Sequence, residues 1–527
     1  MSARTERGVA CLLLLAGAAP FWAGRFLPFL DLPQHLGLAN AIGHLSDPAA
    51  GFSRYYALHR GVDPYWGYYA PMWLLTRVLP LEVASRVVFS AWAVAVPVSV
   101  GFALRSLGRD WRWAVFSLPL VWNTDLFFGF APFLVSMPLF FAAVGLAARD
   151  AEAEGPAGRR PLLLGGAAAA VFLAHVQTYL LFLLCAAALV AVGWRGARWA
   201  LSRSVPYLPS LVLFAAWFLP NFAFGPSPGS PLPHTANYRS FGSILDLGAV
   251  FEPKAAVVAR LPERLFGTYG DGSGEATGIG WALLLGLALL LAGWPDRPRA
   301  DSVGVRGSLR ARRGEMLSLL ALACYLFLPI QIAGQWYLGP RYLVFAALLA
   351  PAWLAARAAG WRVAVLLAAG ALSLAADANA ARKVAAFQRQ VRGFDGLVER
   401  MDPGLRVLGL VFDRGERGPV RQPVLLHFAA YYQALRGGDV GFSFAGLPSI
   451  PLVYRAGAQA PHPGEWAPQD FRWSEMGPSY DYFLVHGEAV GEAASLGEHA
   501  DVVAEAAGWT LWRRRDGPAP GSGPRAR

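Results

Sequence analysis

The sequence predicts a polytopic α-helical membrane protein with a small α/β domain near its C-terminus. Three features predict this class: the composition, a series of long apolar runs, and the placement of arginine between them. Of 527 residues, 55% are hydrophobic and only 15% are charged, and the mean hydropathy is +0.38. Soluble domains carry about 25% charged residues, and a soluble globule could not hide this much apolar surface. The composition therefore excludes a secreted enzyme, a cytosolic enzyme and a disordered chain.

Apolar runs mark eleven candidate membrane spans, because a helix of ~20 apolar residues crosses a bilayer. The run at 162–194 is too long for one span, and we divide it at His175-Val176-Gln177. The run at 113–148 is divided in the same way at Asn123-Thr124-Asp125. The expected spans are 8–24, 81–104, 113–123, 131–148, 162–174, 178–194, 205–220, 276–294, 316–334, 341–356 and 363–376.

Arginine placement gives the expected orientation. Every second loop is rich in arginine. The short loops at 123–130, 175–177 and 335–341 together hold a single arginine, Arg341. Positively charged loops stay in the cytoplasm, so the N-terminus is expected inside and the C-terminus outside. The net charge of +11 is thus a topology signal, and we expect no nucleic-acid partner.

The order of spans and polar regions predicts the domain organisation. Residues 1–376 form the membrane domain, with outer loops at about 25–80 and 221–275. The first span resembles a signal peptide, but ten more spans follow, so we expect an uncleaved anchor. Residues 377–514 form an extracytoplasmic domain, and residues 515–527 form a disordered tail.

The polar C-terminal region predicts a mixture of helices and strands, which is typical of a small α/β domain. We expect helices near 379–401 and 423–435, and strands at 406–412, 440–444, 482–485 and 509–513. Tyr431, Tyr432, Trp466 and Trp473 can line a sugar site, but we favour a role in the core.

The outer loop after the first span begins with candidate catalytic residues. Asp31 is the first acidic residue after that span, and Pro33 can start a helix whose N-terminus favours a carboxylate. His35 lies one helical turn further on. The alternative is that Asp31 only caps the helix. Asp63 is a second acidic candidate in this loop, and the aromatic run 65–69 fits an interfacial belt.

Two further residues stand at the expected outer edge of the membrane. All nine histidines, including His175, fall outside or at that edge, which places acid–base chemistry there. Arg341 should have an anionic partner at such a depth, and its guanidinium suits a phosphate. A snorkelling side chain or an ion pair within the chain is the alternative. The three cysteines fall in apolar runs, where we expect packing roles.

This layout resembles the GT-C superfamily of integral-membrane glycosyltransferases, which use polyprenyl-phosphate-linked sugars. The segment from Asp31 to His35 resembles the Asp-x-Pro-x-His opening of bacterial membrane proteins of this type. The segment Pro340-Arg341-Tyr342-Leu343, followed by Pro351, is similar to an Arg-Tyr-Leu stretch near a late span of such enzymes. The first outer loop departs from many members because it lacks an Asp-x-Asp or Asp-Glu pair. No cofactor is therefore expected with certainty, and a divalent metal stays open.

The resemblance implies transfer of a sugar from a polyprenyl-phosphate donor to an extracytoplasmic glycan, lipid or protein, at the inner membrane of a bacterium. Asp31 would serve as the base, with His35 beside it, and Arg341 would hold the donor phosphate. Asp63, Tyr342 and His175 complete the candidate substrate-binding residues. A lipid or polysaccharide transporter, or a non-catalytic protein of envelope polysaccharide assembly, stays open. A soluble-domain enzyme is the weakest alternative, because that domain has no glycine-rich phosphate loop.

Overall fold

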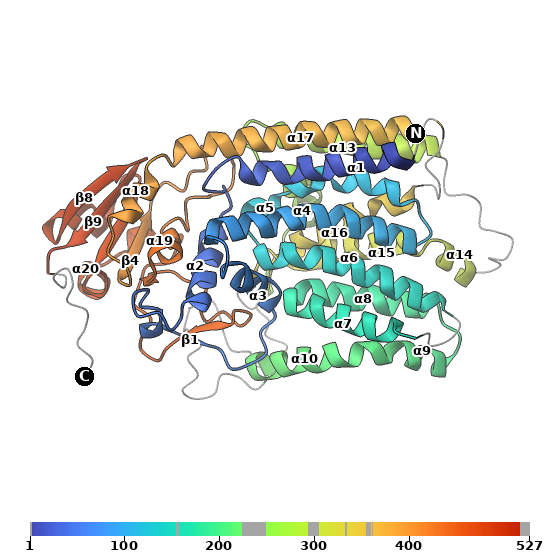
Figure 1. Ribbon diagram of the computed structural model, residues 1–527, viewed down its shortest axis with the longest axis horizontal. Helices are drawn as coiled ribbons and strands as arrows, with labels where there is room; N and C mark the ends of the chain where they lie inside the picture. Colours follow the sequence, from blue (N-terminus) through green and yellow to red (C-terminus); the bar gives the residue numbers. More distant parts are fainter. Residues whose placement is uncertain are drawn as a thin grey trace.

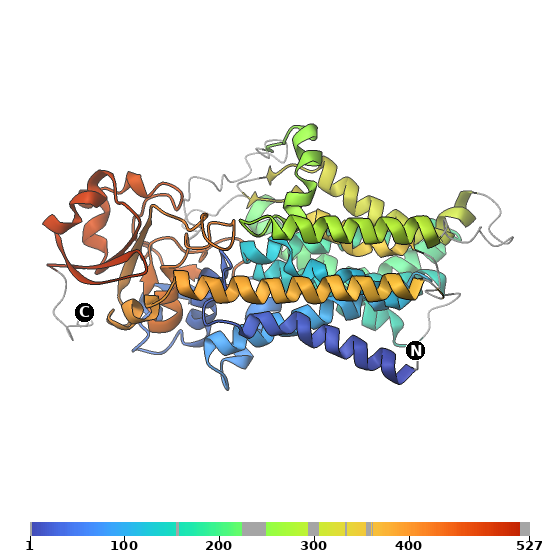
Figure 2. The same cartoon turned by 90° about the horizontal axis from the view of Figure 1, so that it is seen from above.

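The computed structural model is an elongated molecule with a helical bundle at one end and an α/β domain at the other (Figure 1). It describes residues 3–153, 158–223, 249–292, 305–332, 335–354, 360 and 362–516. Residues 224–248 of the expected loop at 221–275 and residues 517–527 of the expected tail at 515–527 therefore lie outside the described residues. The first residues of α1 lie at the bundle end farthest from the α/β domain (Figures 1 and 2).

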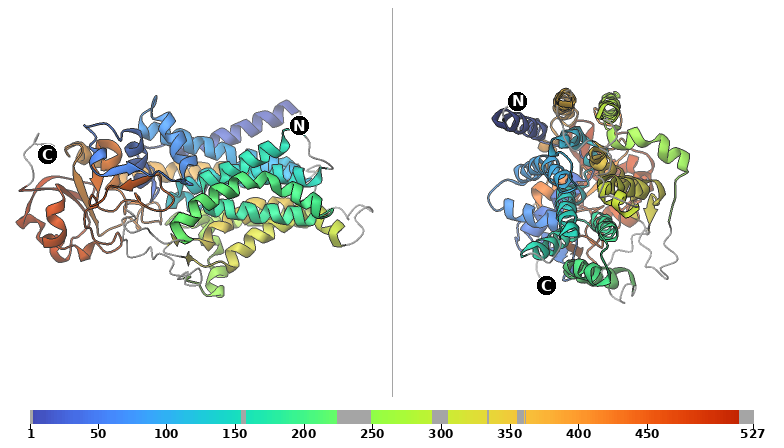
Figure 3. Two further views of the ribbon diagram at one scale, coloured as in Figure 1. Left: turned by 90° about the horizontal axis from the view of Figure 1, so that it is seen from below. Right: turned by 90° about the vertical axis from the view of Figure 1, so that its right-hand side faces the viewer.

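The bundle helices run roughly parallel to the long axis of the molecule, and a view along that axis shows many of them end-on (Figure 3). They are α1 (Ala3–Ala18), α4 (Leu81–Ser106), α6 (Ala131–Glu152), α7 (Arg160–Ala174), α8 (Val176–Val192), α10 (Leu208–Phe218), α13 (Ser273–Ala292), α15 (Arg313–Phe327), α16 (Tyr342–Leu349) and α17 (Arg362–Gln390), with the short α9 (Ala197–Ser204) and α14 (Val305–Ala311).

Four helices within the described ranges are long and apolar enough to cross a membrane: α4, α6, α13 and α17. The apolar helices α7 and α8 are shorter. Both divisions of the long apolar runs agree with the structure, since α7 ends at Ala174 and α8 begins at Val176, while a short helix, α5 (Thr124–Phe128), precedes α6. The expected number of eleven spans stays a prediction.

Some expected spans differ from the structure at proline. Residues 111–122 form two 3₁₀ helices, Trp111–Ser117 and Pro119–Trp122, in place of one α-helix. The helix expected to continue to residue 356 stops at Leu349, and a 3₁₀ turn containing Pro351 follows. Proline has no N–H to donate, so each one removes a hydrogen bond from an α-helical ladder.

The helix α17 joins the bundle to the α/β domain without a break, so the expected domain boundary after residue 376 falls inside a helix (Figure 2). The segment from Ala375 to Ala381 contains five alanines and neither glycine nor proline, which favours an uninterrupted helix. The buried carboxylate of Asp377 is accommodated because it accepts a hydrogen bond from Trp122 Nε1 at 2.9 Å.

The α/β domain contains a five-stranded sheet with the strand order β5-β4-β7-β9-β8. Strands β5, β4 and β7 are parallel, and β9 and β8 are antiparallel to their neighbours. The strands expected near 406, 482 and 509 agree with the structure, whereas β8 and the short β6 were not predicted. The elements are α18 (Phe394–Glu399), β4 (Arg406–Val411), α19 (Ala430–Arg436), β5 (Asp439–Val440), β6 (Leu452–Tyr454), α20 (Trp473–Met476), β7 (Tyr482–His486), β8 (Ala500–Ala506) and β9 (Trp509–Arg514).

The first outer loop packs between the bundle and the α/β domain. Its elements are α2 (Leu32–Gly43), β1 (Tyr56–Leu58) and α3 (Trp66–Leu75). The strand β1 pairs with β6, and α2 packs on α19. Asn40 Nδ2 donates to the Gln433 carbonyl at 3.1 Å, and Gln34 Nε2 donates to the Phe442 carbonyl at 2.8 Å. Loop and domain therefore form one packed unit.

Candidate active site

A cavity of about 660 Å³ lies where the first outer loop, the bundle and the α/β domain meet. The bundle contributes the turn between α5 and α6, the junction of α7 and α8, and the segment before α16. Four of the six candidate site residues line this cavity: Asp31, His35, His175 and Arg341. From the α/β domain come His427, Glu465 and Trp466.

Local geometry fixes the position of Asp31 at the start of α2. Pro33 occupies the first turn of this helix, as the sequence predicts. Asp31 stands at the N-cap position, yet its side chain makes no capping hydrogen bond. The backbone N–H of Asp31 donates a hydrogen bond to the Phe128 carbonyl at 3.0 Å. The capping alternative therefore does not account for this carboxylate, whose side chain lies against the cavity.

A glycine in the turn between α5 and α6 permits this arrangement. Gly129 has a φ of +76°, in the left-handed region. A Cβ atom there would lie 2.7 Å from the backbone nitrogen of Asp31 and 2.8 Å from that of Leu32. Only glycine combines that backbone conformation with so close an approach.

Asp31 forms a buried charge cluster with two residues of the α/β domain. His427 Nδ1 lies 3.1 Å from Asp31 Oδ1, and His427 Nε2 lies 2.6 Å from Glu465 Oε2. The side chain of His427 is 5% exposed and that of Asp31 is 13% exposed. The imidazole thus joins two carboxylates at the wall of the cavity.

The cluster shifts the pKa values of its members. Burial raises the pKa of Asp31 above its usual value, and the nearby positive charge of His427 partly opposes that rise. Burial alone would lower the pKa of His427, but Asp31 and Glu465 outweigh it and raise this pKa to about 9. At neutral pH the imidazole of His427 is therefore charged.

His35 faces the same cavity from α2 as a neutral group. Burial, together with the positive charges of His427 and Arg341, lowers the pKa of His35 to about 3. Its Nδ1 is 2.8 Å from the hydroxyl of Tyr69. Tyr68 and Tyr69 are fully buried, so these two residues of the aromatic run belong to the core and not to an interfacial belt.

Arg341 lies across the cavity, at the end of the 3₁₀ turn Gly339–Arg341. Its guanidinium carbon is 3.8 Å from the centre of the Phe130 ring, and Nη1 is 3.5 Å from His175 Nε2. Among the described residues, no carboxylate oxygen lies within 4.0 Å of Arg341, and its Nε is buried without a hydrogen-bond partner. This guanidinium is therefore placed to receive an anion from the cavity.

His175 is held between aromatic rings at the junction of α7 and α8. It stacks on Tyr65 with ring centres 5.3 Å apart, and Phe133 meets it edge-on at 5.2 Å. The break between the two helices was predicted from the sequence, and it brings His175 to the cavity wall.

Two candidate site residues do not line the cavity. Asp63 is fully buried elsewhere in the loop, where Oδ1 lies 2.7 Å from His59 Nδ1. Tyr342 is buried at the start of α16, directly after Arg341. Their substrate-binding roles stay predictions, and the geometry gives them no direct part in the cavity.

The sequence interpretation did not assign His427 or Glu465 to the site, and it favoured a core role for Trp466. The only local signal for His427 was a histidine inside the apolar stretch from Val424 to Phe428. Trp466 was expected in the core, but it is 49% exposed and lines the cavity, and its Nε1 donates to Glu465 Oε1 at 3.0 Å. Tyr431 and Tyr432 are core residues, as expected.

No set of three or more His, Cys, Asp or Glu side chains is arranged to hold a metal ion among the residues that the structure describes.

No protein-family model matches the chain, and no curated protein sequence matches it. Similar solved structures include ArnT from Cupriavidus metallidurans bound to undecaprenyl phosphate, with a TM-score of 0.53 and 11% identity. That match covers 98% of this chain and 100% of the ArnT chain. The apo structure of the same protein matches with a TM-score of 0.49 and 12% identity, over 97% and 98% of the two chains.

The chain shares its overall fold with ArnT. The resemblance predicted from the sequence is thereby confirmed at the level of fold. The match covers nearly the whole ArnT chain, bundle and C-terminal region together.

Proposed function

We propose that this protein is a membrane glycosyltransferase that moves a sugar from a polyprenyl-phosphate donor to an acceptor hydroxyl in the cavity. The observation that carries the proposal is that Asp31 and Arg341 line the same cavity. Asp31 is paired with His427, whereas Arg341 has no carboxylate partner among the described residues. Base and phosphate-binding cation are the two functions that this transfer requires. The GT-C fold supports it, since ArnT of the same fold binds undecaprenyl phosphate.

In the proposed reaction the acceptor oxygen attacks the anomeric carbon of the sugar. Asp31 takes the hydroxyl proton as the new carbon–oxygen bond forms. The bond between the anomeric carbon and the phosphate oxygen breaks, and the polyprenyl phosphate leaves with the electron pair. Arg341 stabilises the charge that develops on the phosphate, through the two parallel hydrogen bonds that a guanidinium can donate.

The α/β domain completes this site. His427 lies against the Asp31 carboxylate and, as a cation, opposes the rise in the Asp31 pKa that burial causes. Glu465 maintains the charge of His427. The domain would thus tune the base, and the exposed ring of Trp466 at the cavity wall offers an apolar face for a sugar.

The test compares Asp31→Asn with wild type in membranes that contain equal amounts of protein. The amide keeps the size of the side chain but cannot take the acceptor's proton, so the rate of glycan formation should fall roughly 10²–10⁴-fold. Binding of undecaprenyl phosphate, measured by native mass spectrometry, should survive, because Arg341 is unchanged.

The matched control is Asp377→Asn, the same change at another buried carboxylate. Asp377 accepts its hydrogen bond from Trp122 and does not line the cavity, so this variant should keep its transfer rate. Unchanged glycan formation in Asp31→Asn would overturn the proposed base and favour a non-catalytic role in envelope polysaccharide assembly.

A further inference from the structure

A second cavity, of about 670 Å³, lies at the opposite end of the bundle from the candidate active site. Its walls come from α1, α4, the 3₁₀ helix Trp111–Ser117 and the first turns of α17. Figure 2 shows α1 and α17 diverging toward this end. On the predicted topology this is the cytoplasmic side of the membrane.

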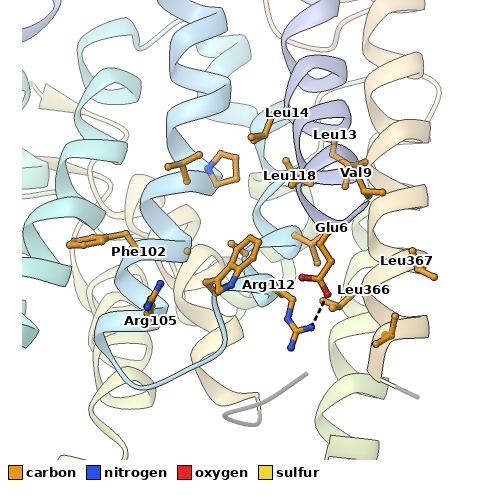
Figure 4. Close-up of a pocket in the computed structure, with 18 of the residues that line it drawn as sticks. Glu6, Val9, Leu13, Leu14, Phe102, Arg105, Arg112, Leu118, Leu366 and Leu367 are labelled. Carbon is orange, nitrogen blue, oxygen red and sulfur yellow. Dashed lines mark hydrogen bonds and ion pairs between the residues drawn. The ribbon is translucent and has the colours of Figure 1, made fainter. Parts of the chain in front are cut away.

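This second cavity, called the groove below, has a mostly apolar wall. Its apolar lining includes Leu13 and Leu14 of α1, Phe102 of α4 and Leu366 of α17 (Figure 4). Val98 and Leu367 also line it, and they are 57% and 53% exposed. Side chains of this kind at the membrane-facing side of a bundle favour hydrocarbon over water.

One end of the groove is basic. Arg105 and Arg112 lie at this end together with Glu6, below the leucines of α1 (Figure 4), and Arg149 also lines the groove. Arg112 is already paired, with Asp110 at 2.7 Å and with Glu6 at 3.5 Å. That pairing leaves the other two arginines to carry the positive charge of the groove.

Arg105 and Arg149 have no carboxylate within 4.0 Å among the residues that the structure describes. Arg149 donates through Nε to Ser106 Oγ at 2.9 Å and lies over Phe102 at 4.4 Å. Three other arginines at this end do have a carboxylate partner: Arg109 with Glu315 at 2.5 Å, Arg203 with Asp150 at 2.9 Å, and Arg313 with Glu152.

We propose that this groove binds an anionic phospholipid of the inner leaflet, with its phosphate at Arg105 and Arg149 and an acyl chain along the apolar wall. A ligand that fits must combine one negative head group with a long apolar tail, which is the chemistry of such a lipid. Basic pockets between membrane helices on the cytoplasmic side bind anionic head groups for this reason. The proposal is independent of the transferase reaction, because the groove lies at the other end of the bundle.

Native mass spectrometry of the delipidated full-length protein tests this, with phosphatidylglycerol and phosphatidylcholine as probes. Wild type should bind phosphatidylglycerol more tightly than phosphatidylcholine. Arg105→Gln with Arg149→Gln should weaken phosphatidylglycerol binding roughly 10- to 30-fold, since each basic side chain near a head group contributes about fivefold.

A second variant tests the apolar part of the groove without changing charge. Val98→Trp places a bulky ring in the groove from an exposed position, so it should lower phosphatidylglycerol binding while the protein stays folded. Two matched controls lie outside the groove: Arg198→Gln on α9 at the same end of the bundle, and Val212→Trp at an exposed position of α10. Both should bind like wild type, and size-exclusion profiles verify folding.

Equal affinity for the two lipids, or equal affinity of the groove variants and the controls, would overturn the proposal. Binding of undecaprenyl phosphate without binding of phosphatidylglycerol would overturn it as well, because the site would then take a different lipid.

Discussion

The pKa of Asp31 depends on two opposing effects that the structure separates. Burial disfavours the charged carboxylate, and the imidazolium of His427 favours it. A base must be unprotonated to act, so transfer should fall as the pH drops through the pKa of Asp31. His427 stays charged up to a pH of about 9, so it opposes the rise in the Asp31 pKa throughout the neutral range.

Replacing His427 with glutamine should therefore move the pH profile. Without the imidazolium, the effect of burial is less opposed and the pKa of Asp31 rises. The acidic limb of kcat/KM should shift to higher pH, and the rate at high pH should change less than the rate at low pH. A purely structural role would lower the rate at all pH values without moving the limb. His462→Gln, in the same domain but outside the contacts of Asp31, is the control.

Arg341→Lys should weaken binding of undecaprenyl phosphate while folding survives. Lysine keeps the charge but cannot donate two parallel hydrogen bonds to a phosphate. The loss of one hydrogen bond to a charged group costs roughly 1.5–3 kcal/mol, or about 10- to 100-fold in Kd. Arg260→Lys, at an exposed arginine that pairs with Glu252, should bind like wild type. Equal Kd values for the Arg341 and Arg260 variants would remove Arg341 from the site.

At the scale of single residues, the sequence was informative where a functional group follows a helix boundary. Asp31, His175 and Arg341 all stand at ends of apolar runs, and these ends were visible as polar interruptions. His427 and Glu465 could not be predicted this way. Both residues come close to Asp31 only because the α/β domain docks on the first outer loop. His427 and Asp31 are 396 positions apart in the sequence (427 − 31), so no local sequence pattern could indicate their contact.

At the scale of elements, the turn between α5 and α6 sets the position of α2. Gly129→Ala would bring a methyl group against the backbone nitrogens of Asp31 and Leu32. We expect a loss of activity together with a destabilisation above the ~1–2 kcal/mol that the left-handed conformation alone costs an alanine. Thermal unfolding and transfer rate per folded protein measure the two effects.

Gly108 provides a control for backbone strain alone. Its φ of +79° matches that of Gly129, but nothing lies within 4 Å of a Cβ placed there. Gly108→Ala should therefore lose stability without losing activity per folded molecule. If the two variants lose activity equally, the contact with α2 does not position Asp31.

The boundaries of helices were predictable where the composition of the sequence changes sharply. They were not predictable where a proline or tertiary packing determines the end of the helix. The polar residues at 175–177 and 123–125 marked real helix ends. The 3₁₀ turns around Pro119 and Pro351 shortened helices that hydropathy alone extends. The continuity of α17 through Asp377 depends on the indole of Trp122, which lies 255 positions away in the sequence.

At the scale of the whole molecule, the α/β domain and the first outer loop must be on the same side of the membrane. They share the β1–β6 pairing, the α2–α19 contact and the Asp31–His427 pair. The C-terminal ends of α6 and α14 lie at the opposite end of the bundle, which is also the end at which α1 starts (Figure 1). If the bundle crosses the membrane along its long axis, the arginine-rich end is cytoplasmic and the α/β domain is outside.

Reporter fusions test this arrangement. Fusions after residues 152 and 311 should report the cytoplasm, because both positions end helices at the arginine-rich end. Fusions after residues 260 and 514 should report the outer compartment, since α12 (Leu261–Phe266) lies beside α5 near the α/β domain. A cytoplasmic signal from residue 514 would place Asp31 and His427 inside the cell. The acceptor would then have to be cytoplasmic, and the proposed transfer to an outer acceptor would fail even if Asp31 proved to be the base.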